Sequence, residues 1–180
     1  MLKLVVCCLC AVVAAAGQGA NPTSSNPLSD EVRESYRIFK TNFLKMADRM
    51  PAEKYGFKPV PEVETFGQRL AHIIVANTRA CAGLKGESKS VGPRSTAKAD
   101  LVVALRDSFA YCDTVFESIT DAAAVQMVAG TIGNPPLPAG TVRSRLSVLY
   151  SIVRHSNEMY GYMAVYLRLN GIVPPSSSPD

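Results

Sequence analysis

The sequence contains no tryptophan, only two histidines, and no long run of lysine or arginine. Its formal net charge is +4, spread along the chain. A mildly basic balance of this kind is typical of an ordinary solvated surface, so we predict no nucleic-acid partner. Two common catalytic motifs are also missing, because the chain has neither a G-x-S-x-G sequence nor a phosphate-binding glycine loop.

An apolar run extends from Leu4 to Ala16 and follows a single positive charge at Lys3. A charged start, an apolar run of this length and small residues at its end are typical of a secretory signal peptide. The run is too short for an ordinary transmembrane helix, so we predict no stable membrane span. We expect residues 1–16 to be removed and the mature protein to be exported, either to a periplasm or outside the cell.

A lipoprotein signal is the alternative, because three cysteines lie within the apolar run: Cys7, Cys8 and Cys10. The residues before Cys7 are Leu-Val-Val, which lack the small residue expected next to an acylated cysteine. Cleavage near Ala16 is therefore the favoured interpretation, and it changes the formal net charge from +4 to +3 because only one lysine is lost.

Four segments place apolar residues at helical spacing, and none alternates apolar and polar residues as a half-buried strand would. In the first segment, Ser29 is the expected N-cap, and in the second, Pro61 is the expected first residue of the helix. The predicted helices cover about residues 29–50, 61–86, 95–119 and 141–170.

Helices of this length and number favour an all-α four-helix bundle over residues 29–173. Residues 17–28 are predicted to be a disordered lead-in, and residues 174–180 a frayed tail. The connections after the second and third helices exceed the short loops that join antiparallel neighbours. At least one long crossover connection is therefore expected.

Export would leave two cysteines, Cys81 and Cys112, on the second and third predicted helices. In an oxidising compartment the two could form a disulfide, and they would approach each other if these helices ran parallel. Alternatively, both could be buried thiols that pack as small hydrophobic side chains. Geometry decides between these possibilities, and the sequence leaves both open.

The two histidines, His72 and His155, lie beside the apolar stripes of their helices and not on them. One interpretation is two exposed or partly exposed side chains on separate surfaces. The other is that the two helix edges meet in a cleft, where imidazole nitrogens could bind a divalent metal.

Two stretches carry a resemblance to a known family: "ETFGQRLAHIIVAN" in the second helix, and "HSNEMYGYMAVYLRLNGIVPPSS" in the last. They resemble the DinB-like (DinB/YfiT-like) superfamily of metal-dependent four-helix bundles, and the similarity extends from about Leu28 to Ser178. The resemblance implies a divalent metal, such as Zn²⁺ or Ni²⁺, held by one histidine of the second helix and two of the last. His72 and His155 match the first two ligands, and Met159 stands at the third position.

Met159 changes the chemistry that the resemblance implies, since a thioether is a soft and weak ligand for Zn²⁺ or Ni²⁺. Glu158 could supply an oxygen, although it points away from the ligand face. We predict a degenerate metal site without tight metal binding, in a protein that binds a small molecule or forms a homodimer. The alternative implied by the resemblance is a divalent-metal-dependent enzyme of the thiol-transferase or hydrolase type. Whether the protein is an enzyme stays open.

Overall fold

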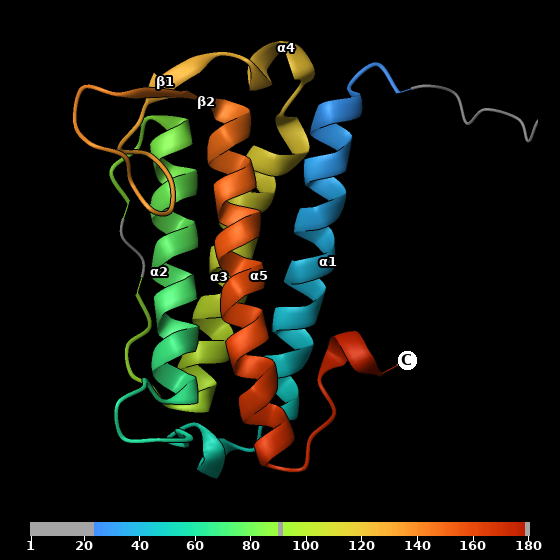
Figure 1. Ribbon diagram of the computed structural model, residues 1–180, viewed down its shortest axis with the longest axis vertical. Helices are drawn as coiled ribbons and strands as arrows, with labels where there is room; N and C mark the ends of the chain where they lie inside the picture. The colour runs from blue at the N-terminus through green and yellow to red at the C-terminus, as the bar shows by residue number, and fades with distance from the viewer. Residues whose placement is uncertain (1–23, 90–91, 179–180) are drawn as a thin grey trace, which may run out of the picture.

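The computed structural model describes residues 24–89 and 92–178, so the predicted signal peptide lies outside the described residues. Four long helices lie side by side and confirm the predicted all-α bundle (Figure 1). Within the described ranges, none of the helices is both long and apolar enough to cross a membrane. The four helices are α1 (Pro27–Arg49), α2 (Phe66–Lys85), α3 (Lys98–Ser118) and α5 (Arg145–Leu169).

Helices α2 and α3 run parallel to each other, while α1 and α5 run in the opposite direction (Figure 1). The starts of α2 and α3 meet, because a Cβ atom at Gly67 would lie 3.1 Å from the carbonyl oxygen of Thr96 and 3.3 Å from Leu101 Cδ1. The connection from Gly86 to Ala97 must therefore return along the length of the bundle. This is the long crossover that the sequence predicted.

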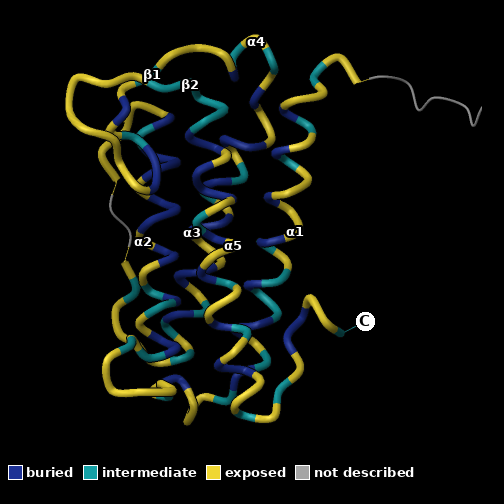
Figure 2. Tube along the Cα trace, in the orientation of Figure 1, coloured by how far each residue is buried: buried dark blue, intermediate teal, exposed yellow. Residues whose placement is uncertain are grey.

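The core is rich in aromatic side chains that α1, α2 and α3 contribute. Buried residues fall on the faces that the helices turn toward one another, as the dark blue positions in Figure 2 show. In each helix the buried residues repeat every three or four positions, so one face of the helix packs against the core. The phenylalanines that are almost completely buried are Phe39, Phe43, Phe66, Phe109 and Phe116.

Two predicted helix starts are wrong. Helix α1 begins at Pro27, with Asn26 as its N-cap, so Ser29 lies buried within the first turn. The predicted lead-in therefore ends two residues earlier, at Asn26. Helix α2 begins at Phe66 and not at Pro61, because Thr65 and Gln68 form a reciprocal capping box that fixes the first turn.

The last two predicted helices also start later than expected, at Lys98 and Arg145. The segment before α5 forms structure that the sequence analysis missed, namely the short helix α4 (Asp121–Ala124) and strands β1 (Met127–Ala129) and β2 (Val142–Ser144). The strands pair antiparallel, with Met127 opposite Ser144. Three-residue strands are too short to produce a recognisable alternation, which explains why they were missed.

The predicted frayed tail packs against the bundle through residue 178, so this prediction is wrong for the described part. Pro174 and Pro175 are buried, and the 3₁₀ turn η2 (Pro175–Ser177) follows. The amide of Ser176 donates a hydrogen bond of 2.9 Å to the hydroxyl of Tyr160 on α5. A second short turn, η1 (Ala52–Lys54), follows α1 where that helix ends.

Candidate functional site

The structure brings the two histidines together where α2 and α5 pack against each other. The Nε2 atom of His72 lies 3.0 Å from the Nε2 atom of His155, and the two ring centroids are 5.2 Å apart. His72 is exposed, whereas the side chain of His155 retains 18% of its accessible surface. The sequence left two interpretations open, and the structure supports the one in which the two helix edges meet.

Neighbouring core residues explain why both imidazoles face the seam between these helices. On α2, Ile73 and Ile74 are completely buried, and His72 stands beside them at the edge of the apolar stripe. On α5, Ile152 and Ser156 are completely buried on either side of His155. The helices are antiparallel neighbours, so one histidine from each reaches the same level of the seam.

The pKa of His155 is lowered from its ordinary value of 6.5, mainly because the ring is partly buried. The nearby His72, Arg154 and Arg79 lower this pKa further, while Glu158 opposes them. A carboxylate oxygen of Glu158 lies 4.0 Å from Nδ1 of His155. The lowered pKa favours the neutral form of His155, in which one ring nitrogen can accept a hydrogen bond or bind a metal.

Met159 lies one helical turn after His155 and is 8% exposed. Ile152 and Tyr166 are buried as well, so the buried face of α5 extends to the side of the helix that carries His155. The sulfur of Met159 lies 3.8 Å from Nη1 of Arg69 on α2, which donates to it.

Arg69 is one residue of this site that the sequence analysis missed. Its Nε donates to the hydroxyl of Tyr166 at 3.1 Å, and its Nη1 lies 3.8 Å from a carboxylate oxygen of Glu64. Its guanidinium carbon also lies 5.1 Å from the ring centroid of Tyr162. The only sequence signal for this residue is its spacing, since position 69 is one helical turn before His72.

A third contact network ties the connection before α5 to the same seam. The Nη2 atom of Arg79 donates to the side-chain oxygen of Asn134 at 3.0 Å, and Nη2 of Arg154 donates to the Asn134 carbonyl at 3.2 Å. Asn134 is itself buried. Two arginines therefore hold this loop beside the histidine pair, and neither Arg79 nor Asn134 was a predicted site residue.

The donor set fits the implied metal only in part. Zn–N bonds are about 2.0–2.1 Å long, so two nitrogens 3.0 Å apart could both contact one ion. The third position, however, offers a thioether whose sulfur contacts a guanidinium. Within residues 24–89 and 92–178, no group of three His, Cys, Asp or Glu side chains could hold a metal. The residues present therefore do not fit a tight Zn²⁺ or Ni²⁺ site.

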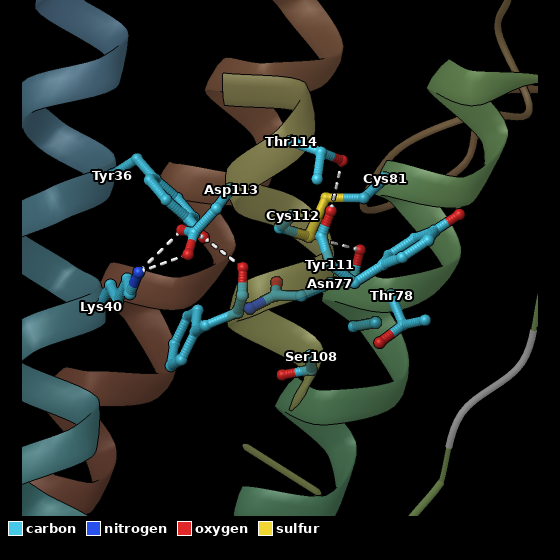
Figure 3. Close-up of a disulfide and its surroundings, with 12 residues drawn as sticks. Tyr36, Lys40, Asn77, Thr78, Cys81, Ser108, Tyr111, Cys112, Asp113 and Thr114 are labelled. Atoms are coloured by element: carbon cyan, nitrogen blue, oxygen red, sulfur yellow. Dashed lines mark hydrogen bonds and ion pairs between the residues drawn. A yellow bond between two sulfur atoms is a disulfide. The ribbon is translucent and has the colours of Figure 1, made fainter. Parts of the chain in front are cut away.

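Cys81 and Cys112 form a disulfide between α2 and α3, with their Cα atoms 5.5 Å apart (Figure 3). Both side chains are completely buried. Cys112 is therefore not available as a nucleophile.

The neighbouring carboxylate of Asp113 binds the ammonium of Lys40 at 2.6 Å and the hydroxyl of Tyr36 at 2.7 Å, as Figure 3 shows.

The sequence matches the family model of the DinB superfamily over residues 36–163. This protein is a member of the DinB superfamily. Its fold is similar to the crystal structure of a DinB-like protein from Bacillus cereus, with a TM-score of 0.63 and 20% sequence identity. The similarity covers 81% of this chain and 95% of the B. cereus chain. No curated protein matches the sequence. At this identity, the structural likeness to the B. cereus protein concerns the fold alone.

Proposed function

We propose that this DinB-superfamily bundle is an exported, non-catalytic binding protein whose ancestral type of metal site is degenerate. His72 and His155 keep the positions of two ligands, and Met159 replaces the third. In this proposal the protein does not bind a divalent ion tightly. The observation that carries the proposal is that the sulfur of Met159 contacts the Arg69 guanidinium, so the third ligand position faces a cation.

Export is supported by the disulfide between Cys81 and Cys112, since such bonds persist mainly in oxidising compartments. This support is independent of the N-terminal sequence. Mass spectrometry of protein from the native cell tests it, because cleavage near Ala16 fixes the N-terminus of the mature chain. A mature protein that still begins at Met1 would contradict export by this route.

A groove between α1 and α5 offers space for a small molecule, with a volume of about 420 Å³. This size falls within the range of about 300–1,000 Å³ that is typical of ligand pockets. Apolar side chains and hydroxyl groups line it together, which suits an amphipathic ligand. The lining residues are Leu28, Glu31, Val32, Ser35, Ser144, Leu146, Ser147 and Tyr150.

A homodimer through a helix face is part of the same proposal, and the last helix offers exposed aromatic side chains for it. Tyr150 and Tyr162 are exposed, but Tyr166 is buried and Tyr160 packs against Phe43 with ring centroids 5.7 Å apart. Light scattering of the mature protein over a range of concentrations tests this, and a constant monomer mass would contradict it.

The second candidate function is a divalent-metal-dependent enzyme of the thiol-transferase or hydrolase type. The close approach of His72 and His155 favours it, because the two Nε2 atoms are already near enough to contact one ion. A metal at such a site would lower the pKa of a bound thiol or water and create a nucleophile. Two imidazoles and a thioether would have to be sufficient to hold it.

Metal titration of the mature protein without a histidine tag separates the two functions. Zn²⁺, Ni²⁺, Mn²⁺ and Cu⁺ are each added, and the stoichiometry and Tm are measured. We expect no tight binding of the divalent ions and no rise in Tm, since only a bound ligand stabilises the fold by mass action. One equivalent of tightly bound Zn²⁺ or Ni²⁺, with a raised Tm, would overturn the proposal in favour of the enzyme.

A further inference from the structure

Arg69 is held in place more firmly than an ordinary surface arginine. Its side chain is only 16% exposed and lies over two aromatic rings, with its guanidinium carbon 5.1 Å from the centroid of Tyr162 and 5.9 Å from that of Tyr166. Cation–π contacts and the hydrogen bond to the Tyr166 hydroxyl both favour this single position. The guanidinium brings a positive charge to this position.

The position of this charge bears directly on the degenerate site. Arg69 stands one helical turn before His72 on α2, and its Nη1 lies 3.8 Å from the sulfur of Met159. An ion held by His72, His155 and residue 159 would therefore sit close to a fixed positive charge. Like charges repel, and the energy doubles for a divalent ion. Glu64 offsets this only partly, because its carboxylate is 3.8 Å away and half exposed to solvent.

We propose that Arg69 is a specificity-determining residue that excludes divalent cations from the His72–His155 pair. This inference rests on the proposed function and deepens it. Restoring the third histidine alone does not restore tight binding of Zn²⁺ or Ni²⁺, because Arg69 still borders the site. Tight binding returns when the third histidine is restored and the charge of Arg69 is removed as well.

The test compares Met159→His alone with two double variants, Met159→His/Arg69→Gln and Met159→His/Arg69→Lys. Gln and Lys both disrupt the stacked guanidinium, but only Lys keeps the charge, so the pair isolates electrostatics from packing. Zn²⁺ and Ni²⁺ affinities are measured by isothermal titration calorimetry at one ionic strength. We expect Met159→His/Arg69→Gln to bind both metals at least tenfold more tightly than Met159→His or Met159→His/Arg69→Lys. The Tm of each metal-free protein is recorded as a check on folding.

Met159→His/Arg106→Gln is the matched control, because it removes one positive charge at the exposed Arg106–Asp48 ion pair on α1 and α3. Its metal affinity should equal that of Met159→His. Salt gives a second measurement that needs no change at Arg69. If the guanidinium repels the ion, raising the ionic strength should tighten metal binding to Met159→His, because repulsion is screened.

Three results would overturn the inference. These are equal affinities of the Gln and Lys double variants, an affinity of Met159→His that already matches the Gln variant, or no binding by the Gln variant. The wild-type protein decides the proposed function separately. If it binds Zn²⁺ or Ni²⁺ tightly, the degenerate site itself is disproved; if it does not, these three results concern Arg69 alone.

Discussion

At the scale of single residues, polar side chains that bond from one helix to another stabilise this bundle. Tyr36 on α1 is 2% exposed, and its hydroxyl lies 2.7 Å from a carboxylate oxygen of Asp113 and 3.0 Å from the carbonyl oxygen of Phe109 on α3. Burial, and next the hydrogen bond with Asp113, raise the pKa of Tyr36 far above its ordinary value of 10.0. The hydroxyl therefore remains protonated and keeps its ability to donate.

Replacing Tyr36 with Phe should lower the free energy of unfolding by about 1.5–3 kcal/mol, the usual range for a hydrogen bond to a charged group. The ring stays in place, so packing against Phe116 is retained and only the hydroxyl is lost. Urea denaturation with wild-type protein as reference measures the change. Tyr162→Phe is the control, since its hydroxyl bonds an exposed Glu158 and its loss should change stability by less than about 0.5 kcal/mol.

The histidine pair was predictable at this scale and the arginine beside it was not. Helical spacing placed His72 and His155 at helix edges, and the family resemblance indicated that these edges meet. Arg69 could not be assigned in the same way, because its importance comes from Met159, Tyr162 and Tyr166, which lie on a different helix. No local pattern in the sequence reports such a contact.

At the scale of helices and strands, distant segments complete each other's ends. Asp121 of α4 accepts hydrogen bonds from the first-turn amides of Leu28 at 3.2 Å and Ser29 at 2.8 Å on α1. In the opposite direction, Arg33 of α1 donates to the carbonyl oxygens of Phe116 and Ile119 where α3 ends. These contacts satisfy backbone groups that every helix end leaves unpaired.

This arrangement explains which helix boundaries the sequence could not predict. The prediction assigned the cap of α1 to Ser29, because sequence spacing can indicate only caps that neighbouring residues form. The first-turn amides of α1 instead donate to the carboxylate of Asp121, which is 92 positions from Ser29 along the chain. By contrast, the cap of α2 is local, and the Thr65–Gln68 pair could have been recognised from its spacing.

Replacing Asp121 with Asn should lower Tm by a few degrees at pH 7, because the carboxylate that accepts from two first-turn amides of α1 loses its negative charge. Partial burial tends to raise the pKa of Asp121, but bonds from Ser29 and Leu28 and the charge of Arg33 lower it below the ordinary 3.8. A lowered folded-state pKa stabilises the protein above pH 3.8, and this contribution disappears as the pH falls further. The Tm difference between the two proteins should therefore shrink in acid.

Asp107→Asn provides the comparison, since it removes the same charge from an exposed position of α3. Its Tm should stay within one degree or so of wild type at all pH values. A Tm difference for Asp121→Asn that stays constant from pH 7 to pH 2 would show that the charge is not responsible.

At the scale of the whole molecule, the disulfide determines how two parallel helices stay together. Cys81 and Cys112 are 31 residues apart in sequence, and the connection between their helices runs the length of the bundle. A covalent link of this kind stabilises a fold mainly by restricting the unfolded chain. It also joins the two helices that share the most extensive contact, so it reinforces an interface that packing already forms.

Replacing both cysteines with Ala should lower the free energy of unfolding by about 2–4 kcal/mol, the typical contribution of one disulfide. Urea denaturation of this variant and of the oxidised wild type gives the difference. Both sulfurs are completely buried, so native protein should resist alkylation after treatment with a reducing agent unless denaturant is present. Rapid alkylation of two cysteines in the native state would contradict the buried disulfide.

The same bond makes a covalent ring from the last turn of α2, the connection and most of α3. The described residues between Gly86 and Ala97 are almost all exposed, so this connection is where a protease would reach the backbone. One cut there would leave both fragments attached through sulfur, with all four long helices still assembled. Such nicked protein would migrate as a single species on a gel without reductant, and separate into two bands only after reduction.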